Sequence, residues 1–385
     1  MPLSDLLVVE LASVLAGPSV GMFFAEHGAR VVKVEAPQGD VTRRWHLATE
    51  DPSDDRPAYF CAVNWGKQSV TLDLTTEAGR DALHRLVATA DLVVSSFRPG
   101  ASAHLGADAD TLRAVNPRLV VVEVDGYGAD DLRTGYDAVI QAEAGFMALN
   151  GAADGPPTKM PVALVDVLAA HQLKEAALVA LLARERTGKG ATVRVSLLGA
   201  AVSSLANQAA NWLTAGVAPQ RMGSAHPNIA PYGTPYPTAT GAIVLAVGTD
   251  RQFAALVEAV GREDLATDAR FVTNAGRVRH RAALDAVLTE ALAGQERDAL
   301  LATLAERGVP AGAVRSVPEV FVQPEAARLV VDDGAGHAAV RTVATEEGRA
   351  LTPPPRLGAD TQAVLAALGL SSAEVDPLAG PGGGP

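Results

Sequence analysis

Short, β-branched apolar runs alternate with helical patterns over the first 125 residues, and this alternation limits the possible folds most strongly. Leu6–Leu11 (LLVVEL) and Arg30–Glu35 (RVVKVE) are typical of buried strands, and they flank a helical stretch that Gly28 ends. Further strands are expected at 68–74, 91–95 and 119–124, with helices between them. Strands that alternate with helices form a mostly parallel sheet. The sequence therefore predicts an α/β fold with a Rossmann-like domain whose ligand crevice lies at the carboxyl ends of the strands.

The turn after the first strand lacks the glycine fingerprint of dinucleotide-binding proteins. Gly17 stands alone there and does not make the G-x-G-x-x-G pattern. No spacing of His, Cys and Asp residues indicates a metal site either. We therefore expect no nicotinamide, no flavin and no metal.

The character of the sequence changes near residue 215. The stretch 223–240 is expected to be rich in loops, with its four prolines outside any strand, and to be followed by a strand at 242–247 and three helices. We expect a large Rossmann-like domain at 1–214, a small α+β domain at 215–325, and a C-terminal segment at 326–385 that returns to the large domain. Its last residues, GPGGGP at 380–385, are expected to form a loose tail.

Charge and composition exclude several classes of protein. A net charge of −12 argues against a nucleic-acid partner. Asp5 and Glu10 interrupt the N-terminal apolar run, which is unlike a signal peptide, and no uncharged stretch reaches transmembrane length. The single cysteine, Cys61, fits a reducing compartment. We expect a cytoplasmic protein without a membrane partner.

One acid, Asp166, stands at the start of the longest helical pattern, which runs to about Arg186. It has two interpretations. An acid at this position commonly caps the helix by accepting backbone N–H bonds, and the stretch by itself favours this role. The acid can also act as a nucleophile or general base, because free N–H groups at a helix start stabilise negative charge.

Basic residues gather in or near the segments that follow the predicted strands. They are Lys33, Arg43, Arg44, Lys67 and Arg98. Each of them alone is more simply a solvated surface base. Together, at one edge of an acidic protein, they predict a local phosphate site.

Ten short phrases, in this order, resemble the class III CoA-transferase family, which includes formyl-CoA and carnitine CoA-transferases and the related α-methylacyl-CoA racemases. The phrases span nearly the whole chain. Among them are VLAGP at 14–18, EHGARVVKVEAPQGD at 26–40, SSFRPGA at 95–101, GYDAVIQAEAG at 135–145, DVLAAH at 166–171 and HPNIAPY at 226–232. The resemblance implies a two-domain chain that forms an interlocked homodimer. It also implies coenzyme A as part of one substrate and one product.

By this resemblance Asp166 occupies the position of the family's aspartate nucleophile. It would attack an acyl-CoA thioester to form a mixed anhydride, CoA would return to give an aspartyl-CoA thioester, and an acceptor carboxylate would take the CoA. An aspartate of ordinary pKa, about 3.9, is already ionised at neutral pH and needs no partner base. The residues implied to line the CoA site are Ala16, Lys33, Lys67, Leu72, Ser96, Phe97, Arg98 and His104.

The segment Gly135-Tyr136-Asp137 bears on which reaction is expected. Racemases of this superfamily use a histidine there, paired with an aspartate that matches Asp166, whereas this chain has Tyr136. Two-sided proton exchange at an α-carbon then lacks its second acid or base. Transfer of CoA is therefore expected, with a 2-methylacyl-CoA racemase as the alternative and a non-catalytic CoA-binding protein as a third possibility. Asp137 lies where transferases often place an assisting acid, and an N-cap on the following helix is an equal alternative.

Two positions depart from the family pattern. Leu15 stands where formyl-CoA transferase has Gln, which argues against a formyl or oxalyl substrate. His104 falls where an arginine would contact CoA, which predicts a weaker or pH-dependent phosphate contact. The resemblance thus assigns Asp166, Asp137 and Tyr136 to the catalytic site and leaves the donor and acceptor acids open.

Overall fold

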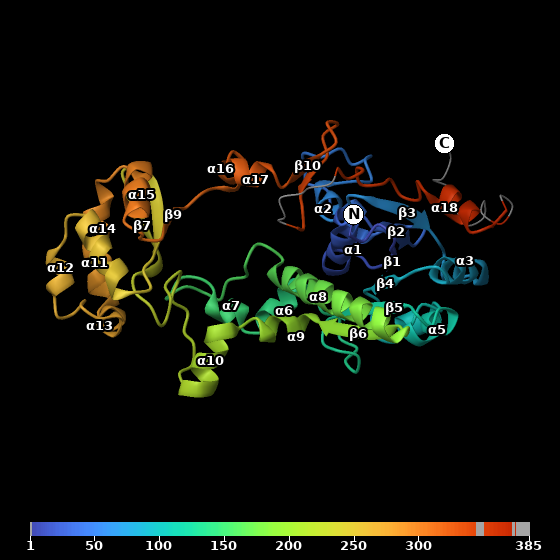
Figure 1. Ribbon diagram of the computed structural model, residues 1–385, viewed down its shortest axis with the longest axis horizontal. Coiled ribbons are helices and arrows are strands. Elements are labelled where there is room, and N and C mark those ends of the chain that lie inside the picture. The colour runs from blue at the N-terminus through green and yellow to red at the C-terminus, as the bar shows by residue number, and fades with distance from the viewer. Residues whose placement is uncertain (1, 344–349, 372–373, 375–385) are drawn as a thin grey trace. The chain divides into compact units, whose positions relative to one another are not determined.

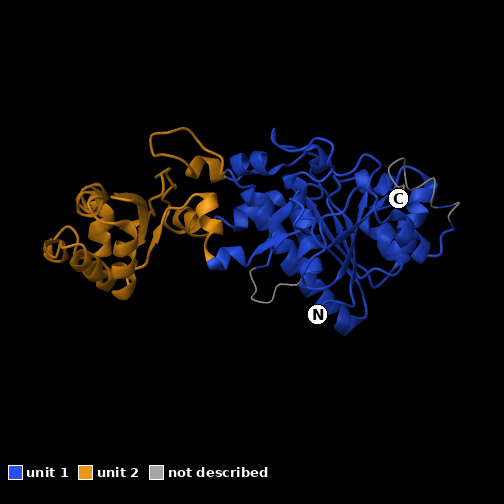
Figure 2. Ribbon diagram, turned by 90° about the horizontal axis from the view of Figure 1, so that it is seen from above, with its two compact units in different colours: residues 1–144, 161–205, 324–385 blue, residues 145–160, 206–323 orange. Residues whose placement is uncertain are grey.

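The computed structural model describes residues 2–343, 350–371 and 374. The expected loose tail at 380–385, and parts of the expected C-terminal segment, lie outside these residues. The chain divides into two compact units (Figure 2). The first comprises 1–144, 161–205 and 324–385, and the second comprises 145–160 and 206–323.

A six-stranded parallel sheet forms the centre of the first unit (Figure 1), as the alternation of strands and helices predicts. In chain order its strands are β1 (Leu7–Leu11), β2 (Arg30–Glu35), β3 (Lys67–Thr71), β4 (Leu92–Ser95), β5 (Val120–Asp125) and β6 (Ala191–Ser196). Their spatial order is β3-β2-β1-β4-β5-β6. The order reverses between β1 and β4, and ligands of such sheets bind outside the carboxyl ends of the strands at this point.

Helices cover both faces of this sheet, which explains why its strands are continuous apolar runs. On one face α1 (Ala16–Glu26) packs against the 24-residue helix α8 (Leu164–Thr187), which also contacts β5 and β6. On the other face, side chains of the sheet share a core with three helices. These are α3 (Glu77–Val87), α5 (Ala109–Val115) and α18 (Thr361–Ala367).

The remaining elements of the first unit are short. They are η1 (Val41–Arg44), α2 (Ala58–Cys61), α4 (Ala101–His104), α6 (Asp137–Glu143), α9 (Leu197–Ser203), α17 (Pro324–Ala327) and the paired strands β10 (Val330–Asp332) and β11 (Ala338–Val340). Most of these segments are too short for sequence periodicity to indicate them, and among them only the helix that starts at Asp137 was expected.

The C-terminal residues return to the parallel sheet through α18. The Asp360 carboxylate accepts a hydrogen bond from the Ser69 backbone N–H at 2.8 Å, and the Thr361 hydroxyl accepts one from the Thr71 N–H at 3.0 Å. Both acceptors satisfy backbone donors of the edge strand β3.

A histidine joins the β10–β11 pair to the loop before α2. His337 Nε2 lies 3.1 Å from an Asp54 carboxylate oxygen, and His337 Nδ1 lies 2.7 Å from one of Asp333. Hydrogen bonds from Arg56, opposed by burial and reinforced by His337, lower the pKa of Asp54 to about 2 from its ordinary 3.8. A carboxylate with a lowered pKa stabilises the fold above its unfolded-state pKa and loses that contribution as the pH falls through its folded-state pKa.

We therefore expect Asp54→Asn to unfold at a lower temperature than the unchanged protein at neutral pH. This difference should shrink as the pH falls from 3.8 towards 2, because both proteins then carry a neutral side chain at this position. Thermal unfolding followed by circular dichroism across this range checks the prediction. Asp130→Asn, at an exposed loop position, is the control. A difference between Asp54→Asn and the unchanged protein that does not depend on pH would contradict it.

The second unit holds a three-stranded antiparallel sheet in the order β7-β8-β9. Its strands are β7 (Tyr232–Thr238), β8 (Gly241–Ala246) and β9 (Ala311–Ala313). Its helices are α7 (Phe146–Leu149), α10 (Ala206–Ala215), α11 (Asp250–Ala259), α12 (Asp264–Thr267), α13 (Asn274–Arg279), α14 (Arg281–Ala293), α15 (Arg297–Glu306) and α16 (Val317–Phe321).

The expectation that the prolines of 223–240 lie outside any strand is wrong at β7, which contains Pro235 and Pro237. β7 pairs with β8 on one side and is an edge strand of its sheet. An edge strand tolerates proline because one of its sides needs no backbone donor. Proline content alone therefore does not exclude a strand at the edge of a sheet.

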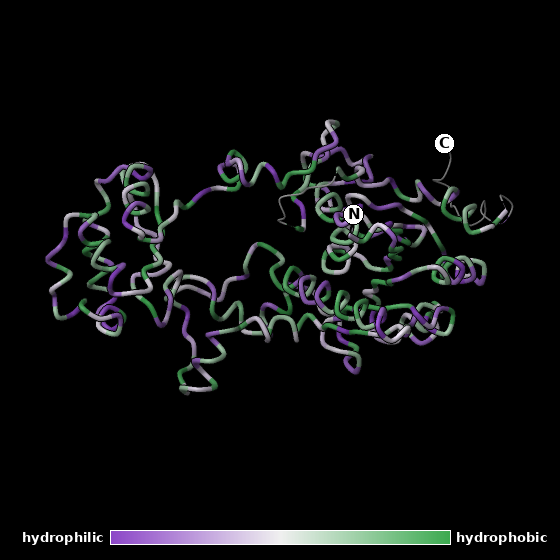
Figure 3. The backbone as a smooth tube through the Cα atoms, in the orientation of Figure 1, coloured by the Kyte–Doolittle hydropathy of each residue, from purple (hydrophilic) through white to green (hydrophobic). Residues whose placement is uncertain are grey.

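Among the described residues, no helix is long and apolar enough to cross a membrane. Figure 3 shows hydrophilic and hydrophobic residues mixed along α8.

Candidate active site

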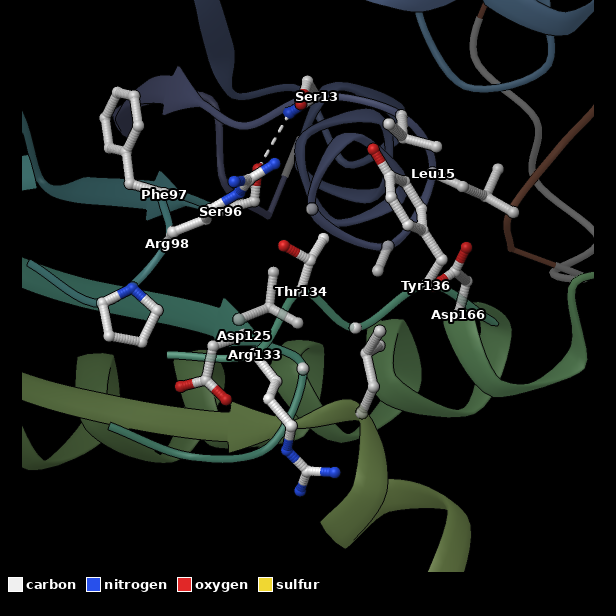
Figure 4. A pocket seen from close by; sticks show the side chains of 18 residues that line it. Ser13, Leu15, Ser96, Phe97, Arg98, Asp125, Arg133, Thr134, Tyr136 and Asp166 are labelled. Carbon is white, nitrogen blue, oxygen red and sulfur yellow. Dashed lines mark hydrogen bonds between the residues drawn. The ribbon is translucent and has the colours of Figure 1, made fainter. Parts of the chain in front are cut away.

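A pocket opens at the carboxyl ends of β1, β4 and β5, where the strand order predicts the crevice. We call it the Asp166 pocket (Figure 4). Three loops and the starts of α1, α8 and α9 line it, through residues 13–17, 96–99, 124–126, 133–136, Asp166 and Leu197. All of these residues belong to the first unit.

Asp166 reaches this pocket from the first turn of α8. Its N-cap residue is Ala163, which makes no side-chain capping bond, and Asp166 is the third residue of the helix. The residue is 9% exposed. A carboxylate in a first turn is stabilised by the positive end of the helix dipole. The long helix expected from the sequence is present, and Asp166 is not its N-cap residue.

Asp137 supplies a bond that the N-cap residue of α8 does not make. One carboxylate oxygen of Asp137 accepts from the Val165 N–H at 2.9 Å, and the other accepts from Gln141 Nε2 at 2.8 Å. Asp137 itself is the first residue of α6, whose N-cap is Tyr136. Its side chain therefore binds the first turn of a different helix, one residue before Asp166, rather than capping its own.

We expect Asp137→Ala to destabilise the protein by about 1–2 kcal/mol, the usual cost of losing a helix cap or leaving a buried donor unpaired. Asp137→Asn should cost less, since its carbonyl oxygen still accepts from Val165. Urea unfolding measures both. Asp110→Ala removes an exposed carboxylate from the first turn of α5 and is the matched control. Equal losses for Asp137→Ala and Asp110→Ala would contradict the assignment.

Two tyrosines lie near Asp166. Tyr136 is half-exposed and lines the pocket, and Figure 4 places it beside Asp166 and Leu15. Tyr59, in α2, packs edge-on against Trp45 with ring centres 4.9 Å apart. Burial raises the pKa of Tyr59, and the negative charges of Asp166, Asp137 and Asp40 raise it further. Tyr59 therefore keeps its proton and can donate a hydrogen bond.

Sequence analysis missed Tyr59. It lies in the irregular stretch between β2 and β3, where no periodicity or motif marks a residue that comes near Asp166. The electrostatic interaction with Asp166 identifies it only once the fold is known.

The residues assigned to the CoA site fall into three groups. Ala16, Ser96, Phe97 and Arg98 line the Asp166 pocket. A neighbouring cavity, the Leu72 pocket, shares Ser13, Ser96 and Phe97 with it and is also lined by Lys33 and Leu72. Lys67 and His104 line neither cavity, and His104 is exposed at the end of α4.

Two of the predicted phosphate-binding bases are already bound to other groups. Lys33 Nζ lies 3.0 Å from a Glu10 oxygen, 3.0 Å from an Asp40 oxygen and 2.7 Å from the Ala12 carbonyl oxygen. Lys67 Nζ lies 2.8 Å from the other Glu10 oxygen and 2.9 Å from both the Pro18 carbonyl oxygen and Asn64 Oδ1. A lysine ammonium has three N–H donors. Neither lysine therefore has an N–H left for a phosphate.

Arg43 is likewise engaged, because its guanidinium is buried against Glu35 and Asp55. The interpretation of the basic residues as one phosphate cluster therefore needs correction, since sequence spacing does not reveal carboxylates that neutralise them. Arg98 differs from them. It is exposed, it borders the Asp166 pocket, and it makes no ion pair with any described residue.

The four buried charges Glu10, Lys33, Asp40 and Lys67 form a balanced set of two acids and two bases, which we call the charge cluster. Burial works to lower the pKa of Lys33, but Glu10, Asp40 and Glu35 raise it overall. Burial lowers the pKa of Lys67 to about 8, against the opposing effect of Glu10. Burial works to raise the pKa of Asp40, but Lys33 and the bonds from Thr42 lower it overall.

Within residues 2–343, 350–371 and 374, no group of three or more His, Cys, Asp or Glu side chains could hold a metal ion.

Comparison with known proteins places this chain among CoA-transferases. Residues 3–361 match CoA-transferase family III. The chain is 39% identical to a succinate–glutarate CoA-transferase of Agrobacterium fabrum, over 95% of this chain and 96% of the relative. It is 36% identical to an acetyl-CoA:oxalate CoA-transferase of Acetobacter aceti, over 85% and 84%. Among solved structures, a CaiB/BaiF family protein from Brucella suis aligns with a TM-score of 0.82 and 41% identity, over 96% of this chain and 99% of that chain.

Proposed function

The chain belongs to CoA-transferase family III, whose enzymes move CoA between an acyl-CoA and a carboxylic acid, and we propose that it does so through covalent intermediates on Asp166. The observation that carries this proposal is the position of Asp166. It is a largely buried carboxylate at the start of α8, and it borders a pocket at the carboxyl ends of the parallel strands. A carboxylate can act as a nucleophile without a partner base.

The first half of the proposed reaction releases the donor acid. An Asp166 oxygen attacks the thioester carbonyl carbon, the C–S bond breaks, and CoA leaves as the thiolate, which gives a mixed anhydride. The thiolate then attacks the Asp166 carbonyl carbon. The bond between this carbon and the bridging anhydride oxygen breaks, the donor acid leaves as a carboxylate that carries that oxygen, and Asp166 becomes a CoA thioester.

The second half repeats these steps in reverse with the acceptor. The acceptor carboxylate attacks the aspartyl thioester, which releases the CoA thiolate and forms a second anhydride. The thiolate attacks the acceptor carbonyl carbon, and Asp166 leaves as a carboxylate. No net proton is consumed, so the site must mainly stabilise oxyanions and exclude water.

The acids exchanged are proposed to be dicarboxylic. Relatives of this chain carry names such as succinate–glutarate CoA-transferase and succinyl-CoA:mesaconate CoA-transferase. Arg98 supports the proposal, because it brings an exposed cation to the edge of the Asp166 pocket and can meet an anionic group of either substrate. Arg133 also borders the pocket, but its guanidinium is bound to Asp131 and Glu143. Figure 4 shows its side chain directed away from Asp166.

Incubation with succinyl-CoA and a panel of carboxylic acids, followed by mass spectrometry of the CoA esters, tests the function. We expect glutaryl-CoA and related dicarboxyl-CoA products, and much slower transfer to acetate. Solvent deuterium at the α-carbon of a 2-methylacyl-CoA, without an acceptor acid, would instead favour the racemase. Failure to transfer CoA to any dicarboxylic acid would contradict the substrate assignment.

We also propose that the chain forms an interlocked homodimer, as the family resemblance implies. Exposed apolar side chains support a partner surface: Val179 and Leu182 on α8, and Trp212 and Leu213 on α10. Light scattering during gel filtration should give twice the mass of one chain. A monomer at micromolar concentration would contradict this proposal.

A further inference from the structure

The loop between β1 and α1 has a strained backbone. Val14 has φ of 70°, in the left-handed region. A β-branched residue rarely adopts this conformation, and such strain persists only where the surrounding structure holds it. Residues 13–15 of this loop border the Asp166 pocket, and residues 12 and 13 border the Leu72 pocket.

The charge cluster holds this loop from inside the protein. Lys33 donates to the Ala12 carbonyl oxygen at 2.7 Å, and both Asp40 oxygens accept from the Val14 N–H, at 3.3 and 3.4 Å. The salt bridge between Lys33 and Asp40, at 3.0 Å, fixes these two contacts relative to each other. The two residues therefore hold the peptide groups on both sides of Ser13.

Asp40 is itself held in place. One of its oxygens accepts from the Thr42 N–H at 3.0 Å and from the Thr42 hydroxyl at 2.8 Å, as the N-cap of η1. Its carboxylate thus connects η1, Lys33 and the strained residue. An acceptor with both oxygens in use does not turn without breaking several bonds.

The other half of the charge cluster holds the first turn of α1. Lys67 bridges Glu10 and the Pro18 carbonyl oxygen. Gly21, one turn further on, leaves room for this arrangement, since a Cβ there would lie 1.8 Å from a Glu10 oxygen. The cluster thus contacts the backbone at Ala12, Val14 and Pro18, on both sides of the residues that face the Asp166 pocket.

We propose that Lys33 and Asp40 are positioning residues, which hold the loop 12–15 with Val14 in its strained conformation and thereby set the wall of the pocket that faces Asp166. The inference rests on the proposed function for its effect on catalysis. It gives Lys33 and Asp40 a role other than binding phosphate, and it explains why Lys33 is buried with its ammonium bound to carboxylates and to the Ala12 carbonyl oxygen.

Asp40→Asn tests the proposal, because an amide places N–H donors against Lys33, Val14 or Thr42. A misplaced pocket wall should lower kcat by about 10- to 100-fold. The KM for the acyl-CoA should change by only about twofold, because ground-state binding is largely kept. Hydrogen–deuterium exchange should rise in the peptide that covers 12–18, a readout that does not depend on activity.

Val14→Gly provides the rescue. Glycine adopts a φ of 70° without strain, so the loop no longer needs Lys33 and Asp40 to hold this conformation. Val14→Gly by itself should leave hydrogen–deuterium exchange unchanged outside residues 12–18. The double variant Val14→Gly with Asp40→Asn should have a kcat at least several-fold higher than that of Asp40→Asn alone. If Asp40→Asn alone does not fold, the double variant compared with Val14→Gly supplies the same test.

Asp91→Asn is the matched control. Asp91 also accepts a backbone N–H, from Leu7 at 2.8 Å, and pairs with a base, Arg184, at 2.9 Å. It holds the amino end of β1, however, rather than the loop at its carboxyl end. Asp91→Asn should lower the unfolding temperature and leave kcat unchanged.

Unchanged kcat in Asp40→Asn, unchanged exchange over 12–18, or an equal fall of kcat in Asp91→Asn would overturn the proposal. An unchanged protein that transfers CoA between no acids would overturn the proposed function instead, and exchange over 12–18 would still decide whether Asp40 holds the loop.

Discussion

Asp166→Ala is expected to lower kcat for CoA transfer by about four orders of magnitude or more, because it removes the group that forms both covalent intermediates. Binding of acyl-CoA should persist, since Asp166 is one of many residues that line the pocket. Steady-state rates with succinyl-CoA and glutarate, beside a binding measurement with CoA, separate the two effects. Substantial turnover by Asp166→Ala would refute the covalent mechanism.

The loss of activity should not arise from unfolding. A first-turn carboxylate contributes about 0.3–1 kcal/mol through the helix dipole, so Asp166→Ala should unfold within a few degrees of the unchanged protein. Glu175→Ala, at an exposed position of the same helix, is the control for α8 and should retain full activity.

Gly135→Ala is expected to lower kcat by about 100-fold, the effect of displacing a catalytic group by an ångström. A Cβ on Gly135 would lie 2.4 Å from the Cα of Gly126, and one on Gly126 would lie 2.6 Å from the N and Cα of Gly135. The two backbones therefore touch, and neither can yield as a flexible side chain does. Separation of the two segments moves Tyr136 and Asp137, which follow directly in the chain.

Activity and unfolding temperature should both fall in Gly135→Ala. Gly294→Ala is the control, because a Cβ there meets no atom within 4 Å and the backbone φ is −89°. It should leave the rate unchanged. Full activity in Gly135→Ala would show that the approach of these two segments does not position the site.

The sheet was predictable because buried parallel strands leave a direct mark on the sequence. Arg30–Glu35 forms β2 with the predicted boundaries, since valine at three of six positions fits a strand covered on both faces. The long helix α8 was predictable from its apolar periodicity. The strand β7 was not, because its prolines are tolerated only at a sheet edge, and edge position depends on pairing partners far along the chain.

The part of the site that depends on strand order was predictable from the sequence. The ion pairs and hydrogen bonds between its charged residues and their partners were not. Ala16, Ser96 and Phe97 come together because the ends of parallel strands share one edge of the sheet. The shared partner of Lys33 and Lys67 was hidden, because Glu10 reaches them from β1, which adjoins the strand of Lys33 and is separated by β2 from the strand of Lys67. The bond from Val165 to Asp137 was hidden as well, since the two residues lie 28 positions apart.

Trapping the covalent enzyme would show whether Asp166 carries the intermediates. The protein is incubated with succinyl-CoA without an acceptor, quenched with hydroxylamine, digested and analysed by mass spectrometry. Hydroxylamine cleaves an aspartyl thioester or anhydride, so we expect a hydroxamate on Asp166 that Asp166→Ala lacks. An unmodified Asp166 in a preparation that transfers CoA, or a hydroxamate on another residue, would contradict it.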